Sequence, residues 1–198
     1  MVQLEGRAGC PRIPPSARLH ERDDQRRRAW SENQENRWFT RNEWGLEGEG
    51  NLWLPPGVVI PWADSEGVSS VNTRRPSGNV EPGADDQWKR WKYQRAAGLS
   101  APMYGVQWIG DPMPIVLVEG EFDALAVQQQ ADDICRPVAT GSTGGARRKR
   151  WRKLLANVPA VLIAFDAEEP GENAAREWTS ALPNAIRWPP TPPTRARC

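Results

Sequence analysis

The sequence predicts an α/β protein in which a parallel sheet with flanking helices follows a small, mainly β lobe. Short apolar runs such as Ile115–Glu119 and Val161–Asp166 end abruptly in carboxylates, and β-branched runs of this kind are typical of strands buried on both faces. Helical segments separate these runs, which indicates right-handed crossovers between parallel strands. The stretch before them is rich in tryptophan, glycine and proline, which favours short strands and turns.

Composition divides the chain into four parts. Residues 1–36 are polar and rich in Arg, Pro and Glu, so we expect a disordered or weakly helical tail, with a nucleic-acid-binding arm as the alternative. Residues 37–110 form the predicted β lobe, and residues 111–190 form the α/β domain. Residues 191–198 are Pro-rich and are expected to be extended.

The β lobe contains one clear hairpin and one ambiguous stretch. Val58–Trp62, the turn Asp64–Gly67 and the run Val68–Arg75 predict two antiparallel strands. Further on, Trp88–Gln94 interleaves aromatic and basic side chains. Stacking aromatics among cations suit single-stranded nucleic acid, whereas a strand with buried tryptophans and solvated cations gives the same pattern. The residues alone leave both interpretations open.

The α/β domain alternates strand and helix throughout. The expected helix after the first strand, 121–131, presents Phe122, Leu125, Ala126 and Gln129 to the sheet. A second helix covers 146–157, and a third, 172–182, begins after Pro170-Gly171. The expected strands are 115–119, 136–140, 161–166 and 185–188.

Acidic residues follow two of these strands at the point where each strand ends. Parallel sheets bind their ligands at this edge, so neighbouring strands would bring Glu119 and Asp166 together, with Asp123 and Glu168 nearby. Like charges at close range are costly unless a cation or a proton offsets them. Oxygen ligands without a supporting His or Cys suit Mg²⁺.

Two glycine-containing turns are candidate phosphate contacts. Gly120 lacks a side chain where a phosphate could approach. The turn that includes Gly141 and Ser142 offers backbone N–H groups ahead of the following helix. Each turn is a weak signal alone, and the order in which the turns and acids occur is more specific.

Bulk composition excludes several classes of protein. The formal net charge is +1, so charge alone indicates no nucleic-acid partner, and local patches must be judged separately. Cys10, Cys135 and Cys198 are far apart and His20 is the only histidine, which predicts no zinc site in this chain. Without a disulfide framework, signal peptide or membrane-spanning run, a cytoplasmic protein is expected.

The ordered combination of these motifs resembles the Toprim domain, which is shared by DnaG-type primases, topoisomerases, old-family nucleases and RecR-like proteins. Glu119-Gly120 matches the Glu-Gly of the first strand, and Asp166-Ala167-Glu168 matches the Asp-x-Asp of the third. The run 119–125 is similar to the Glu-Gly-x-x-Asp-Ala-Leu of primase-like proteins from phages and mobile elements. The resemblance covers roughly residues 38–190, and it implies a Rossmann-like Toprim sheet preceded by a primase-type lobe.

The resemblance implies DNA primase activity, in which RNA primers are made on single-stranded DNA from ribonucleoside triphosphates by Mg²⁺-dependent nucleotidyl transfer, with Mn²⁺ as an alternative ion and a replicative helicase as a partner. Glu119 would be the catalytic base or a metal ligand. The implied metal ligands are Glu119, Asp123, Asp166 and Glu168. The implied nucleotide or nucleic-acid contacts are Arg74, Arg75, Lys92, Gly120, Gly141 and Ser142.

The sequence departs from the family pattern in ways that keep other functions open. Glu168 replaces the usual Asp, and its longer arm shifts the carboxylate by about one C–C bond, while Mg²⁺ tolerates little error in its ligand distances. The expected acidic site after the last strand is missing from Thr191–Cys198. A Toprim nuclease that uses the same acids, and a catalytically impaired nucleic-acid-binding primase fragment, therefore remain alternatives.

Overall fold

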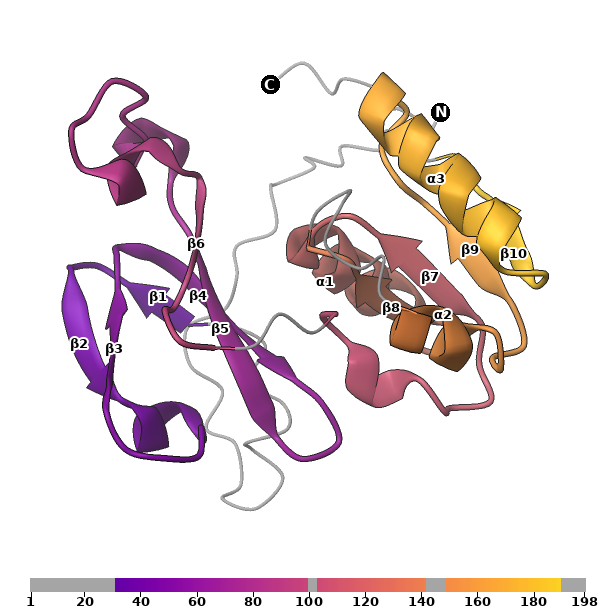
Figure 1. Ribbon diagram of the computed structural model, residues 1–198, viewed down its shortest axis with the longest axis horizontal. Coiled ribbons are helices and arrows are strands. Elements are labelled where there is room, and N and C mark those ends of the chain that lie inside the picture. Colours follow the sequence, from indigo (N-terminus) through magenta and orange to yellow (C-terminus); the bar gives the residue numbers. More distant parts are fainter. Residues whose placement is uncertain (1–30, 100–102, 142–148, 190–198) are drawn as a thin grey trace, which may run out of the picture.

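The computed structural model describes residues 31–99, 103–141 and 149–189. It contains an antiparallel β lobe and a parallel sheet with flanking helices, which lie side by side (Figure 1). The predicted α/β fold class is thereby confirmed. Within the described residues, no helix is long and apolar enough to cross a membrane.

The β lobe is built on a four-stranded antiparallel sheet in the order β1-β4-β5-β6, with a separate hairpin, β2-β3. The predicted hairpin is confirmed as β4 and β5, which are joined by a turn where the Asp64 N–H donates to the Gly67 carbonyl at 2.8 Å. The strands of the lobe are β1 (Ser31–Asn33), β2 (Arg37–Thr40), β3 (Asn51–Leu54), β4 (Gly57–Ala63), β5 (Val68–Arg74) and β6 (Tyr93–Arg95). Strand β1 lies inside the predicted tail, so the ordered lobe begins before residue 37.

Short 3₁₀ turns connect these strands: η1 (Arg41–Trp44), η2 (Ser77–Asn79), η3 (Gln87–Arg90) and η4 (Val106–Trp108). The ambiguous basic-aromatic stretch thus divides into η3 and β6. Trp91 and Tyr93 are 46% and 40% exposed, so the expectation of a strand with buried tryptophans is wrong at Trp91. The Tyr93 ring lies beside the cationic groups of Arg74 and Lys92.

The parallel sheet has the strand order β10-β9-β7-β8, and every neighbouring pair is parallel. Its strands are β7 (Ile115–Val118), β8 (Arg136–Ala139), β9 (Val161–Ile163) and β10 (Ala185–Arg187), and its helices are α1 (Glu121–Ala131), α2 (Lys149–Leu155) and α3 (Glu169–Ala181). Helix α3 begins at Glu169, three residues before the expected start, because Pro170 is tolerated in the first turn, where its missing N–H costs nothing.

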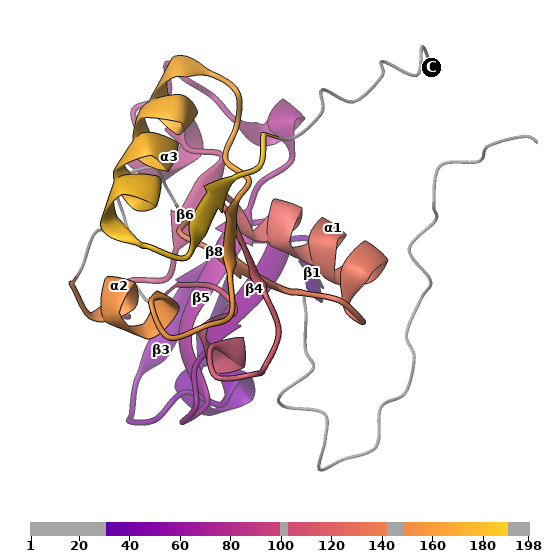
Figure 2. The same ribbon diagram turned by 90° about the vertical axis from the view of Figure 1, so that its right-hand side faces the viewer.

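The two faces of the parallel sheet have different partners. Alternate strand residues such as Leu117 and Ile163 pack against α2 and α3. The opposite set, including Val116 and Val118, packs against α1 and against Ile60 and Trp62 of β4. One core cluster therefore joins the β lobe to the α1 face of the sheet, while α2 and α3 cover the other face (Figure 2).

Helix α1 packs on this shared core with only part of the expected side, because Phe122 and Leu125 contact the core as predicted. Its buried residues are Glu121 and Ala124, whereas Ala126 and Gln129 are exposed. The β lobe covers the beginning of the helix, so Glu121 is buried by contacts with that lobe as well as by packing on the sheet.

Candidate active site

The two acid-bearing strands are direct neighbours. Strands β7 and β9 pair in parallel, with Leu117 opposite Ile163. Their chains therefore continue to Glu119 and Asp166 at the same edge of the sheet. The Asp166 backbone N–H donates to Glu119 Oε1 at 3.3 Å. The two strand ends are thus neighbours, as expected, and the metal ion that they would share stays a prediction.

The carboxylates at this edge influence one another. Burial raises the pKa of Glu119, and the negative charges of Asp166, Asp123 and Glu168 raise it further. The hydrogen bond from the Asp166 N–H has the opposite, smaller effect on this pKa. Burial also raises the pKa of Asp123, with Asp166 as the next cause. All four predicted acids therefore lie in one negative field, which a cation would relieve.

The four acids suit a metal ion by the type of their ligand atoms and by their place at one edge of the sheet. Among the described residues, no three acidic, histidine or cysteine side chains converge as a preformed metal cage. The donors are all carboxylate oxygens, which suit Mg²⁺ or Mn²⁺. Glu119 Oε1 accepts a backbone hydrogen bond, and the second oxygen of this carboxylate is not used by that bond.

Gly171 makes the close approach of the two acidic strand ends possible. A Cβ atom at this position would lie 2.8 Å from Glu119 Oε1 and would collide with the Asp166 carbonyl oxygen. Since real Cβ atoms do not approach backbone oxygens so closely, any side chain would push α3 away from the Asp166 loop. The first turn of α3 can therefore pack directly against the acids only with glycine here.

Arg187 holds the end of β9 from the neighbouring strand. Its Nη1 donates to the carbonyls of Ile163 at 2.9 Å and Phe165 at 3.0 Å. Its other nitrogens contact the Glu172 carboxylate on α3, which lowers the pKa of Glu172. The guanidinium thus connects β10, α3 and the loop that carries Asp166. The sequence reasoning did not find this role, because only the strand pairing reveals it.

Cations and aromatic rings of the β lobe face the acids. The Arg74 guanidinium lies 4.3 Å from the centre of the Phe122 ring and 5.5 Å from that of Tyr93. Arg74 lowers the pKa of Asp123 against the stronger effect of burial, and it lowers that of Tyr93 in the same way. Lys92 is exposed beside Tyr93, with Nζ 5.9 Å from the ring centre. Arg74 therefore lies near Asp123, while Lys92 is placed only beside Tyr93, and the predicted contacts of both residues with phosphates stay predictions.

Arg75 does not lie beside the acids as Arg74 does. It is 4% exposed, and its guanidinium donates to backbone carbonyls of the loop around η3, including Trp88 at 3.0 Å and Lys89 at 2.7 Å. It also contacts the Asn79 carbonyl and the Trp88 ring. Adjacent strand residues point to opposite faces. Arg75 therefore organises this loop, which corrects its expected role in holding phosphates.

The predicted glycine turns are only partly described. At Gly120, a Cβ atom would lie 3.0 Å from Asp123 Oδ2, so the glycine leaves room for this acid. Gly141 has φ +76°, and a Cβ atom there would lie 2.5 Å from the Trp62 ring. Gly141 thus serves the packing between the lobes, and its N–H donates to the Glu119 carbonyl at 2.8 Å. Ser142 lies outside the described residues.

A buried polar contact between the lobes was missed by the sequence reasoning. Glu121 is 3% exposed, and the Asn72 amide donates to its Oε1 at 3.4 Å. The Arg95 Nε donates to Asn72 Oδ1 at 3.3 Å. Burial raises the pKa of Glu121, while Asn72, Arg95 and Arg74 lower it. An acid in the first turn of a helix usually has an electrostatic role there, so the sequence contained no signal for this contact.

Comparison with known families agrees with this geometry. Residues 116–189 match the family model described as Toprim-like. The chain carries a Toprim-like domain. This domain spans the parallel sheet from β7 to β10, and it includes all four predicted acids. None of the curated proteins compared with the chain matches it.

Solved primase structures share the fold over a larger part of the chain. The primase fragment of the bacteriophage T7 primase-helicase protein is 19% identical, with a TM-score of 0.51 over 69% of this chain and 56% of that one. The RNA polymerase domain of Mycobacterium tuberculosis primase DnaG is 20% identical, with a TM-score of 0.50 over 73% of this chain and 51% of that one. The chain thus spans about half the length of these structures. The likeness shows a common, primase-type fold for the Toprim-like domain and part of the β lobe.

Proposed function

We propose that this chain is a DNA primase-like nucleotidyltransferase that makes RNA primers on a DNA template. The observation that carries the proposal is the opposition of two charged surfaces: the acids at the ends of β7 and β9, and Arg74 on β5. Negative carboxylates and a facing cation suit a triphosphate, which needs both a metal and a direct positive charge. The fold shared with primase structures supports the same choice.

Asp166 and Glu168, with Asp123, would hold the metal. When bound, Mg²⁺ neutralises the triphosphate and the charge that develops as the bond to the α-phosphate forms. Arg187 and Gly171 position Asp166 by fixing the loop from both sides. Glu168 is the N-cap residue of α3 and would supply its carboxylate from there.

Glu119 would accept the proton of the attacking 3′-hydroxyl. Its raised pKa suits this task, because a carboxylate with an elevated pKa is a stronger base than an ordinary one. The Asp166 N–H that it accepts fixes its orientation relative to the other strand end. The Glu119 side chain is only partly buried.

The β lobe would bind the substrates of this reaction. Arg74 and Lys92 would contact phosphates of the template or of ribonucleoside triphosphates, and the exposed rings of Trp91 and Tyr93 would stack on template bases. Residues 37–110 would then act as a primase-type lobe and 111–190 as the catalytic domain. We further propose a cytoplasmic location and a replicative helicase partner, since the bacteriophage T7 relative is part of a primase-helicase protein.

A primer-synthesis assay tests the proposal. The chain is incubated with single-stranded DNA, Mg²⁺ and labelled ribonucleotides, and short RNA products are expected. Asp166→Asn should reduce the rate by about 10²-fold or more while leaving the fold intact, and Arg37→Gln on the exposed edge of the β lobe is the matched control. Degraded template in place of RNA would identify a nuclease, and template binding without either product would identify an impaired primase fragment.

A further inference from the structure

Positive charge is concentrated in one segment of the chain. Between Asp133 and Asp166 the sequence has no acidic residue, although the whole chain has a net charge of only +1. The cations of this segment are Arg136, Arg147, Arg148, Lys149, Arg150, Arg152 and Lys153. The rest of the chain is therefore negative, and the segment stands out as a local basic surface.

Helix α2 carries four of these cations in its seven residues. Trp151 and Leu155 are buried against the sheet, while Lys149, Arg150 and Lys153 are exposed. Cations in the first turn oppose the helix dipole, and like charges three or four residues apart repel one another. Stability of the helix thus does not account for this charge pattern, which indicates a ligand of opposite charge.

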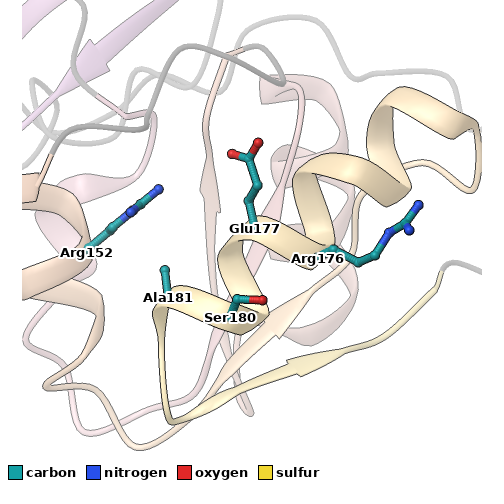
Figure 3. Close-up of a pocket in the computed structure, with 5 residues that line it drawn as sticks. All are labelled: Arg152, Arg176, Glu177, Ser180 and Ala181. Atoms are coloured by element: carbon teal, nitrogen blue, oxygen red, sulfur yellow. The ribbon is translucent and has the colours of Figure 1, made fainter.

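A shallow hollow of about 500 Å³ lies between α2 and α3 beside this helix. Arg152 extends from α2 toward α3, and Arg176, Glu177, Ser180 and Ala181 line the opposite side (Figure 3). The Arg152 Nε is buried and has no hydrogen-bond partner among the described residues. The guanidinium lies 5.9 Å from the centre of the Trp178 ring, and the side chain is only partly buried, so a phosphate in the hollow would meet a charged donor.

The hollow lies away from the candidate active site. Helices α2 and α3 cover one face of the sheet, whereas α1 and the β lobe cover the other. Arg176 uses its guanidinium for local contacts with Glu172 and Asn173 on its own helix. Glu177, the acid at the hollow, has an interaction partner of its own. Arg152 and the exposed cations of α2 therefore supply the charge that a ligand would meet.

We propose that α2 and the adjoining hollow bind the phosphate backbone of single-stranded nucleic acid. Arg152 donates to a phosphate in the hollow, and Lys149 and Lys153 contact the neighbouring phosphates. This surface would hold the part of the nucleic acid that extends beyond the acids. It lies on the face of the Toprim-like sheet opposite the β lobe. The identity of the strand as primase template rests on the proposed function, whereas the backbone contact does not.

The test is the salt dependence of binding to a fluorescein-labelled single-stranded DNA of mixed sequence, measured by anisotropy with the full chain. Lys149→Gln combined with Arg152→Gln should weaken binding roughly tenfold at low salt and make the slope of log K against log[salt] shallower by about 1.4, because each of the two lost phosphate contacts to a single strand contributes about 0.7. Arg152→Lys, which keeps the charge, should retain most of the slope. Arg37→Gln removes a similar exposed cation from the β lobe, where it lies over Phe39, and should leave the slope unchanged.

An unchanged slope in the double variant overturns the proposal, and so does an equal loss in Arg37→Gln. Displacement of the DNA by polyglutamate as effectively as by unlabelled DNA would point to an acidic protein partner and also overturn it. Asp166→Asn separates this proposal from the proposed function: it should abolish primer synthesis and leave the salt slope intact. A chain without primer synthesis whose slope still depends on α2 would refute only the primase assignment.

Discussion

The two lobes of the molecule differ in what they bring to the site. The Toprim-like domain contributes four acids from neighbouring strand ends, while the β lobe contributes cations and half-exposed aromatic rings. A shared apolar core and the buried Asn72–Glu121 contact hold these surfaces opposite each other. The site therefore belongs to neither lobe alone, since acids without the facing cations would repel a triphosphate.

The largest effect is expected on the Toprim-like side, at Gly171. In Gly171→Ala the added methyl group would collide with the Asp166 carbonyl and the Glu119 carboxylate, so the variant should lose about 1–3 kcal/mol of stability and its activity. Urea unfolding and primer synthesis measure the two losses. Gly83→Ala is the matched control, because a Cβ atom there meets nothing within 4 Å. A Gly171→Ala variant as stable and active as wild type would contradict the described packing.

On the β-lobe side, Arg74→Gln should weaken substrate binding without disturbing the fold. The variant loses the cation over Phe122 and Tyr93, and a charge-assisted contact to phosphate contributes about 1.5–3 kcal/mol. KM for ribonucleotides should therefore rise about tenfold or more, while urea unfolding stays close to that of wild type. An unchanged KM would show that Arg74 of the β lobe does not contact the ribonucleotide.

Arg187 tests how rigidly the acidic loop must be held. Arg187→Gln loses the hydrogen bonds to the Ile163 and Phe165 carbonyls, so the affinity for Mn²⁺, followed by its electron spin resonance signal, should fall several-fold. Supporting contacts around metal ligands typically contribute about 10–100-fold in affinity. Arg187→Lys should restore part of the affinity. Equal metal affinity in all three proteins would show that the loop needs no support from β10.

The smallest effect is expected from pH in the absence of a metal. The pKa values of Glu119, Glu121 and Asp123 are raised in the folded chain. Stability from such groups is fully present below their unfolded pKa and is lost as pH rises through the folded pKa. The metal-free Tm should therefore increase as pH falls from 7 toward 5.

Asp123→Asn isolates one of these groups. It removes a charge that Asp166 repels, so the Tm at pH 7 should rise by about 1–3 °C and depend less on pH. Differential scanning calorimetry at both pH values measures the change. A lower Tm at pH 7, or a pH dependence equal to that of wild type, would contradict the electrostatic description.

Much of the Toprim-like domain could be predicted because its signals are local. Aliphatic runs ending in Glu119 and Asp166 predicted parallel strands, and their adjacency placed the acids correctly. The lobe contacts could not be predicted, since Arg74 and Arg75 look equivalent in the sequence and only the strand's two faces separate them. Glu121 and Arg187 were missed for the same reason: their partners, Asn72 and the β9 carbonyls, are distant in the chain.

A crystal structure of the chain soaked with Mn²⁺, with its anomalous scattering, tests the central claim most directly. We predict an ion coordinated by Asp166 and by further carboxylate oxygens at this edge of the sheet, with Glu119 beside it and still accepting the Asp166 N–H. An ion bound elsewhere, or acids that remain unliganded at a saturating Mn²⁺ concentration, would contradict a metal-dependent site at this edge of the sheet.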